Sequence, residues 1–409
     1  MRILILSHNE ICYNPRLLKA ADYFAEKGWE VIVFNPVTGI ASREVYQNAI
    51  KNKPWTILEN DISRRNTVSS VRWLWVSLIN KFIALLWSKT GSKAGFTYFM
   101  NKGLIGALSK IKGRYDYILI HLVDNLPFAA GLKQRTGARL IYDSQEYFRG
   151  QYRKYAKPLS DWVNLAEPKF ISSVDVLLAT TNAMLEQLKK DYRLSIPSFR
   201  VRNLPSRLML QLPEFTDDDP SSTAPLKLVW HGMTIYFNNT RGLTILLKAV
   251  ANCKTPVHLY LQGLITTEEK AVFENFMKDE PLKGKVSLLA PAEPYEIVNS
   301  LVHYDIGLIG ELAQEENQML TSSNKLFDFI NAGLTVIASD LPGLKETINE
   351  YQCGYSYPSG DFLKMAELID RLGEDRSLLK QMKLKSRAGS QKGLNWELDY
   401  DKVWSVLQA

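Results

Sequence analysis

The chain has few cysteines, no glycine-rich loop after its first apolar run and no long uninterrupted apolar segment. Cys12, Cys253 and Cys353 lie far apart without CxxC or Cys/His spacing, which argues against a disulfide scaffold and a structural zinc site. An apolar fraction of 46% and a charged fraction of 23% exclude disorder and a polytopic membrane protein. The start, MRILIL, is typical of a strand and not of a signal peptide, so a cytoplasmic protein is expected.

Acidic residues are also absent from one long stretch, although the whole chain of 409 residues has a net charge of only +7. No Asp or Glu occurs between Ile62 and Tyr115. The basic residues of this stretch are Arg64, Arg65, Arg72, Lys81, Lys89, Lys93, Lys102, Lys110, Lys112 and Arg114. Such a patch attracts phosphate-rich partners, namely anionic lipid, a polyphosphate substrate or nucleic acid.

Short apolar runs alternate with helical patterns through both halves of the chain. This rhythm predicts an α/β protein with two doubly wound, Rossmann-like domains, each built on a parallel sheet. The predicted parts are an N-terminal domain over 1–205 with a basic, aromatic insertion at about 62–115, a linker over 206–225, a C-terminal domain over 226–392 and a final helix over 393–409 that returns to the N-terminal domain. Ligands of such sheets bind beyond the carboxyl ends of the strands, where His8, His121 and His231 fall.

The first strand–helix turn, SHNEICYNPR, argues against a dehydrogenase. It contains no glycine, so the dinucleotide fingerprint of NAD and FAD enzymes is absent. Arg16 follows Pro15 at a helix start, where its guanidinium could reach a phosphate in a cleft beside His8. A solvated first-turn arginine is the alternative interpretation.

The most informative segment is SSNKLFDFINAGLTVIASDLP, residues 322–342. Backbone N–H groups at the helix start around Ser323 and Asn324 would bind a diphosphate, and Lys325 adds a positive charge. Asp328 lies on the same helix face as Asn324, where its carboxylate can accept two hydrogen bonds from ribose hydroxyls. The alternative is an ordinary capped helix with a solvated aspartate.

This segment resembles PNKLFEYMAAGLPVVASD, the donor motif of a subgroup of retaining glycosyltransferases of family 4, which have the GT-B fold. Further fragments resemble the family in the same order, among them NPRLLKAADYFAEKGWEVIVF, LIYDSQEYF and WHGMTIYFNNTRGL, so the resemblance covers nearly the whole chain. It implies two domains facing across a cleft. It also implies transfer of a sugar from a UDP- or GDP-linked donor to a lipid-linked or saccharide acceptor, with retention of configuration and without a metal ion.

The resemblance also assigns roles to residues. The donor would be bound by Gly232, Arg241, Gly263, Ser323, Asn324, Lys325 and Asp328. The catalytic candidates are Gln145, Glu146 and His121. Gln145 stands where the family has a histidine, Leu320 replaces its first donor-motif glutamate, and Met233 replaces an arginine. A non-hydrolysing nucleotide-sugar epimerase shares the fold and is one alternative, although it would need several cleft carboxylates and Leu320 and Gln145 argue against it. The departures motivate a second alternative, a non-catalytic GT-B protein that acts as a membrane or complex partner.

The segment Val71–Trp87 is apolar and aromatic, but it is too short to span a bilayer and is interrupted by two basic residues. Tryptophans with flanking Lys and Arg are typical of an interfacial helix on an anionic membrane, and a helix packed on the sheet is the alternative. The residues predicted to meet the membrane or the acceptor are Arg72, Trp73, Trp75, Lys81 and Trp87. No nucleic-acid motif accompanies the charge, so nucleic acid is not an expected partner.

Overall fold

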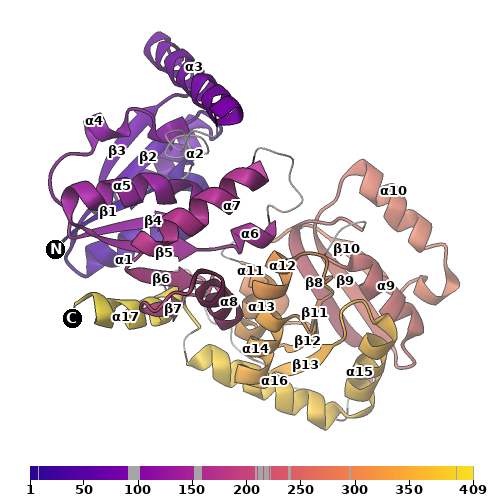
Figure 1. Ribbon diagram of the computed structural model, residues 1–409. Helices are drawn as coiled ribbons and strands as arrows, with labels where there is room; N and C mark the ends of the chain where they lie inside the picture. Colours follow the sequence, from indigo (N-terminus) through magenta and orange to yellow (C-terminus); the bar gives the residue numbers. More distant parts are fainter. Residues whose placement is uncertain are drawn as a thin grey trace. The chain divides into compact units, whose positions relative to one another are not determined.

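The computed structural model describes residues 1–7, 9–90, 102–151, 159–207, 210, 215, 221, 223–237, 241–293, 296–392 and 394–408. It divides the chain into two compact units, Met1–Val201 and Arg202–Ala409. Each unit contains one sheet in which all the strand pairs are parallel. The predicted pair of doubly wound α/β domains is therefore confirmed (Figure 1).

Unit 1 is built on a sheet in the order β3-β2-β1-β4-β5-β6-β7. Its strands are β1 (Arg2–Leu6), β2 (Glu30–Val37), β3 (Thr56–Asp61), β4 (Tyr117–His121), β5 (Arg139–Ser144), β6 (Val176–Ala179) and β7 (Ser198–Arg200). Its helices are α1 (Pro15–Glu26), α2 (Arg43–Ile50), α3 (Thr67–Thr90), α4 (Ala107–Lys110), α5 (Leu126–Thr136), α6 (Phe148–Gln151), α7 (Leu159–Phe170) and α8 (Asn182–Tyr192).

The central strands of unit 1 are apolar because both faces of the sheet are covered. Each residue of β4 is buried, as is each residue of β1 after Arg2. Helix α1 begins where Asn14 accepts a hydrogen bond from the Leu17 N–H at 3.1 Å, with Pro15 in the first turn. This turn brings the next residue, Arg16, inward at the carboxyl edge of the sheet.

Helix α3 differs from the other helices of unit 1 because it extends away from the sheet (Figure 1). It lies within the predicted basic, aromatic insertion. None of the helices in the described part of the chain is both long enough and apolar enough to cross a membrane.

Unit 2 is built on a sheet in the order β10-β9-β8-β11-β12-β13. Its strands are β8 (Leu226–Thr234), β9 (Val257–Leu264), β10 (Val286–Leu289), β11 (Ile306–Ile309), β12 (Thr335–Ser339) and β13 (Gly354–Tyr357). Its helices are α9 (Leu243–Asn252), α10 (Thr267–Phe276), α11 (Ile297–Leu301), α12 (Glu316–Leu320), α13 (Asn324–Asn331), α14 (Pro342–Tyr351), α15 (Phe362–Glu374), α16 (Arg376–Gln391) and α17 (Trp396–Leu407).

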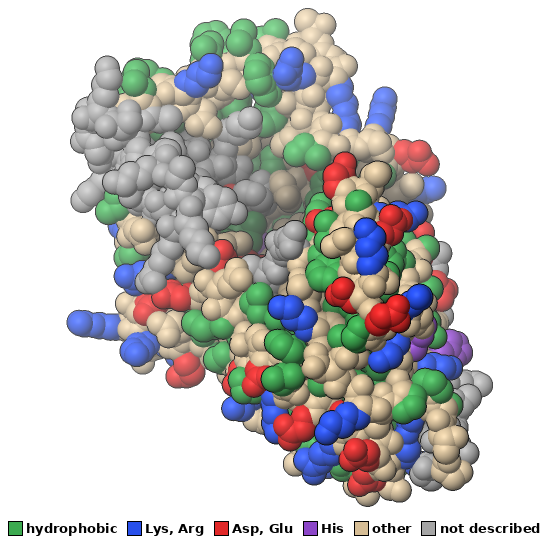
Figure 2. All heavy atoms as spheres, turned by 90° about the vertical axis from the view of Figure 1, so that its right-hand side faces the viewer, with side chains coloured by type: hydrophobic (Ala, Val, Ile, Leu, Met, Phe, Trp, Pro, Cys, Tyr) green, Lys and Arg blue, Asp and Glu red, His purple; other side chains and the backbone are tan. Residues whose placement is uncertain are grey.

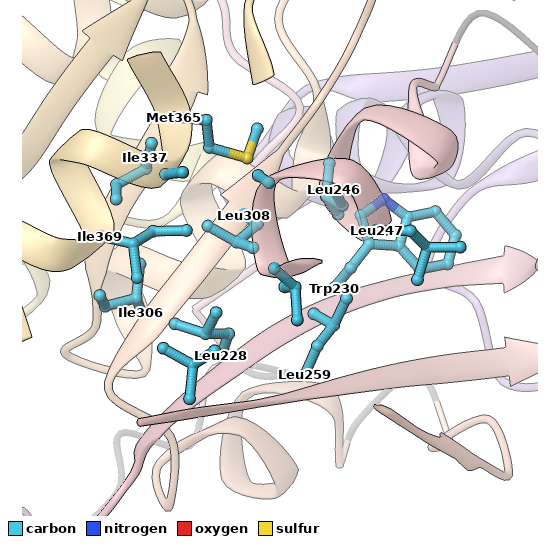
Figure 3. Packing of buried hydrophobic residues seen from close by; sticks show 14 of the residues in the cluster. Leu228, Trp230, Leu246, Leu247, Leu259, Ile306, Leu308, Ile337, Met365 and Ile369 are labelled. Atoms are coloured by element: carbon cyan, nitrogen blue, oxygen red, sulfur yellow. The ribbon is translucent and has the colours of Figure 1, made fainter. Parts of the chain in front are cut away.

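The core of unit 2 lies between its sheet and the helices α9 and α15 (Figure 3). Strands β8 and β11 and helix α9 contribute to one buried cluster, which includes Leu228, Trp230, Leu246, Ile306 and Leu308. These side chains are 0–1% exposed, so the carboxyl ends of β8 and β11 are held by a packed interior.

The last helix of unit 2 is fixed by a buried ion pair. The guanidinium of Arg202 donates two hydrogen bonds to Asp399 of α17, both at 2.8 Å, and a third to the Tyr351 hydroxyl at 2.7 Å. The predicted return of the segment 393–409 to the N-terminal domain stays a prediction. So does the linker over 206–225, much of which lies outside the described residues.

Candidate functional site

The candidate donor site lies at the carboxyl edge of the unit 2 sheet. Strands β8 and β11 are neighbours there, and helix α13 begins after the segment that follows β11. His231 belongs to the end of β8, Glu311 follows β11, and Lys325 and Asp328 belong to α13. Parallel α/β sheets bind ligands at this edge, since loops and helix N-termini meet there.

Lys325 provides a buried cation at this edge. Its Nζ lies 5.3 Å from the centroid of the Trp230 ring and 3.8 Å from Glu311 Oε1, and it donates a hydrogen bond to Ser323 Oγ at 3.3 Å. Burial lowers the pKa of Lys325, Glu311 opposes this shift, and the positive charge of Arg241 adds to it. Lys325 and Arg241 therefore act on the same region, where a polyanion would relieve their mutual repulsion.

The start of α13 is arranged to receive an anion. Ser323 stands at the N-cap position, but its side chain makes no capping hydrogen bond to the helix. The hydroxyl oxygen of Ser322 is buried and has no hydrogen-bond partner among the residues that the structure describes. Backbone N–H groups at a helix start, a buried lysine and an unpartnered hydroxyl are together suited to phosphate oxygens.

Asp328 lies beside His231. The Nε2 atom of His231 and the Oδ2 atom of Asp328 are 3.3 Å apart, without the geometry of a hydrogen bond. Burial raises the pKa of Asp328 to about 7, and Lys325 opposes this shift. Burial, assisted by Lys325, lowers the pKa of His231 to about 3. The imidazole of His231 and the carboxyl group of Asp328 are therefore both largely shielded from water. Hydroxyl groups of a ligand would be suitable hydrogen-bond partners for them.

Glycines bring the backbone segments of this edge together. A Cβ atom on Gly242 would lie 1.7 Å from the carbonyl oxygen of Gly310, and Gly242 has φ +68°. A Cβ atom on Gly263 would lie 2.6 Å from the carbonyl oxygen of Gly232, and one on Gly232 would lie 2.6 Å from the Trp230 ring. Gly232 and Gly263, predicted as donor-binding residues, thus permit close packing of the ends of β8 and β9.

A second polar cluster lies at the carboxyl edge of the unit 1 sheet. Fully buried His121 ends β4, and its Nδ1 is 3.0 Å from Asp143 Oδ2 and 2.8 Å from Gln145 Nε2. Its Nε2 is buried and finds no hydrogen-bond partner in the described part of the chain. The following residue, Leu122, has φ 71° and ψ 152°, a conformation that a side chain rarely adopts. The strained turn and the carboxylate together fix the imidazole.

Arg16 belongs to this cluster. It is buried, contrary to the prediction that its guanidinium is open to a phosphate. Its guanidinium is buried and donates to both oxygens of Asp143, at 2.6 and 2.8 Å, and to the Val201 carbonyl at 2.8 Å. Burial by itself would raise the pKa of Asp143, but Arg16 and the hydrogen bond from His121 hold it well below its usual range. The sequence shows Arg16 at a helix start but gives no sign of a partner so distant along the chain.

The structure brings together part of the predicted catalytic set. His121 and Gln145 are in direct contact, and Glu146, half-buried, follows at the end of β5. His8 lies outside the described residues. Among the predicted donor residues, Arg241 is exposed and Asn324, at the first position of α13, is exposed too.

Four residues of these clusters carried no assigned role in the sequence analysis: Trp230, His231, Glu311 and Asp143. His231 was visible only as a histidine at a strand end. The other three become informative through contacts with Lys325 and His121, which short-range patterns do not contain.

Comparison with known proteins gives a consistent fold. No protein-family model and no curated protein sequence matches the chain. Among solved structures, it is similar to sucrose-phosphate synthase from Thermosynechococcus elongatus, with a TM-score of 0.68, 14% identity and coverage of 100% of this chain and 98% of that one. HepE from Anabaena, solved in complex with UDP, gives a TM-score of 0.65, 14% identity and coverage of 100% of both chains. A glycosyltransferase from Rickettsia africae gives 0.66, 13% identity and coverage of 100% and 97%.

The chain has the GT-B fold. The parallel sheets of seven and six strands and the likeness over the full length support this conclusion. At identities this low the likeness concerns the fold, so the activity has to be inferred from the site.

Proposed function

We propose that this protein is a glycosyltransferase that moves a sugar from a nucleoside-diphosphate sugar to an acceptor. The observation that carries the proposal is the grouping of Lys325, Asp328 and the start of α13 at the carboxyl edge of the unit 2 sheet. A diphosphate would lie against the cationic helix start, and the ribose hydroxyls would bond to Asp328. The UDP complex of HepE, a protein of the same fold, supports a uridine donor.

The proposed reaction breaks the bond between the anomeric carbon and the diphosphate, so negative charge develops on the leaving group. Lys325, Arg241 and the N–H groups of Ser323 and Asn324 would stabilise that charge without a metal ion. Within the described ranges no three His, Cys, Asp or Glu side chains gather in a way that could hold a metal. We further propose that configuration is retained, as the resemblance to family 4 implies.

The acceptor side of the proposal rests on the His121 cluster of unit 1. Its buried imidazole, fixed by Asp143, would meet a hydroxyl of the acceptor through Nε2, and Gln145 would contribute a hydrogen bond. The acceptor is a lipid-linked or saccharide molecule in this proposal.

A donor panel tests the function. The protein is incubated with UDP- and GDP-sugars in EDTA, with and without a mixture of glycolipid and oligosaccharide acceptors, and release of nucleotide is measured. We expect one donor to be consumed and Lys325→Met to abolish its consumption. Conversion of the donor to its epimer, or no turnover together with no nucleotide binding, would contradict the proposal.

A further inference from the structure

Helix α3 presents an apolar face to solvent. Val71, Leu74, Trp75, Leu78, Ile79, Phe82, Leu85 and Leu86 are all exposed, with Trp75 at 64% and Phe82 at 61%. Their spacing of three and four residues places them on one side of the helix. Figure 2 shows hydrophobic side chains with neighbouring Lys and Arg over this part of unit 1, at the top of the view. Contiguous apolar surface of this kind marks an interaction site.

The opposite side of α3 is already anchored to unit 1. Ser69 and Val76 are buried, and the ring of Trp73 lies 4.5 Å from the Arg64 guanidinium. The Arg72 Nη1 donates a hydrogen bond to the Asp61 carbonyl at 3.1 Å. The helix therefore cannot bury its apolar face by turning over. Of the predicted patch residues, Trp75 lies on the exposed face and Trp73 does not, while the side chain of Trp87 lies outside the described residues.

Positive charge borders this apolar face. Lys81 is exposed on α3, Arg64 and Arg65 are exposed just before the helix, and no acidic residue occurs between positions 62 and 115. Arg72 is also close enough to Lys110 to help lower the pKa of that lysine, after the larger effect of burial. An apolar stripe bordered by Lys and Arg is complementary to a bilayer with anionic headgroups.

We propose that the exposed face of α3 docks on an anionic phospholipid bilayer and lies in the plane of its headgroup region. A helix of 24 residues is about 36 Å long and would seat its apolar side chains at the acyl boundary while Lys81 stays among the phosphates. Neither the apolar stripe nor the charge gives stable attachment alone, and here both are present. This part of the inference rests on the proposed function: an enzyme held on the bilayer would receive an acceptor that is itself carried by a lipid.

Vesicle sedimentation tests the proposal on the full chain without donor or acceptor. We expect the protein to pellet with phosphatidylglycerol/phosphatidylcholine vesicles at low salt and to be released from them at high salt. It should not pellet with vesicles of pure phosphatidylcholine. Leu78→Ser/Phe82→Ser should weaken binding by at least about tenfold. The matched control, Leu363→Ser/Leu384→Ser, alters exposed leucines of unit 2 and should bind like the wild type.

Two further measurements separate the apolar and the charge contributions. Lys81→Glu should weaken binding, whereas Lys345→Glu, an exposed lysine on α14, should not. The emission spectrum of Trp75 is obtained by subtracting the spectrum of Trp75→Phe from that of the wild type. Its maximum should shift to the blue when anionic vesicles are added. Circular dichroism and melting curves identify any variant that fails to fold. If Leu78→Ser/Phe82→Ser does not fold, the vesicle binding of Lys81→Glu and the emission of Trp75 test the proposal.

Three results would overturn the proposal: wild type that stays in the supernatant at low salt, vesicle binding unchanged by Leu78→Ser/Phe82→Ser, or a dimer in solution that this double variant dissociates. The last would make a second copy the occupant of the face. Nucleotide binding is measured on the same variants by calorimetry, so loss of vesicle binding with intact UDP binding separates this proposal from the proposed function.

Discussion

His231 and Asp328 hold their polar atoms 3.3 Å apart at the edge of the unit 2 sheet, and burial favours the neutral form of each. With a pKa of about 3 for the imidazole and about 7 for the carboxyl group, His231 is neutral at physiological pH and Asp328 is close to half ionised. In the proposed function, donor binding is thereby linked to the ionisation of one buried carboxyl group.

The first prediction concerns pH. Only the ionised form of Asp328 accepts hydrogen bonds from two ribose hydroxyls, so UDP affinity should rise as pH increases through about 7. In Asp328→Asn, affinity should be lower and this rise should be absent, while titration of the diphosphate itself affects both proteins equally. Calorimetry across the neutral range measures the difference, and parallel pH profiles would refute a ribose contact by Asp328.

Lys325 should be essential for affinity. Lys325→Met keeps most of the apolar side chain but removes a buried, charge-assisted contact, which corresponds to a loss of about 1.5–3 kcal/mol in UDP binding. Lys345→Met removes an exposed lysine of the same unit and should leave the dissociation constant unchanged. Equal affinities for the two variants would show that the diphosphate does not lie at the start of α13.

Gly242 should tolerate no side chain. In Gly242→Ala the new Cβ would lie 1.7 Å from the Gly310 carbonyl oxygen at a φ of +68°, so a loss of about 1–3 kcal/mol in unfolding free energy is expected. Gly131→Ala in α5 is the control, since its Cβ would meet no atom of the described residues within 4 Å. Urea denaturation compares the two, and a neutral Gly242→Ala would contradict the close approach of these backbones.

Asp143 should stabilise unit 1 and orient His121. Asp143→Asn leaves Arg16 buried without its counter-charge, so about 3–5 kcal/mol of stability should be lost at neutral pH. The folded-state pKa of Asp143 is depressed, so its contribution is complete above its unfolded pKa of about 3.9 and is lost as pH falls towards the folded value.

The destabilisation caused by Asp143→Asn should therefore shrink in acid. The double variant Arg16→Met/Asp143→Asn should be more stable than Asp143→Asn alone, because no unpaired charge remains. Denaturation at several pH values measures both effects. A double variant less stable than either single variant would refute the ion-pair account.

The sequence was sufficient for the elements whose signals are local. Helix α13 begins where the sequence predicts a helix start, at Ser323 and Asn324, because a polar cap and a helical period define it within a few residues. Helix α1 begins at the predicted Pro15, where the Asn14 cap and the proline lie next to each other in the chain. Local spacing also placed Lys325 and Asp328 on the same short helix.

Contacts between distant residues explain what the sequence did not reveal. Arg16 has its partner 127 residues away, so a first-turn arginine was indistinguishable from a phosphate ligand. Glu311 follows strand β11 whereas Lys325 lies on helix α13, so their ion pair depends on how unit 2 folds. For α3, the apolar period was visible in the chain, but whether that face meets the sheet or solvent depends on the anchoring of Arg72 and Val76 to unit 1.

Calorimetric titration of the wild-type protein with UDP and with GDP, in EDTA, tests the central claim most directly. The account predicts that one nucleotide binds without a divalent cation and that Asp328→Ala weakens it about tenfold or more, with an unchanged fold by circular dichroism. Binding that requires added Mg²⁺ or Mn²⁺, or an unchanged dissociation constant in Asp328→Ala, would contradict it.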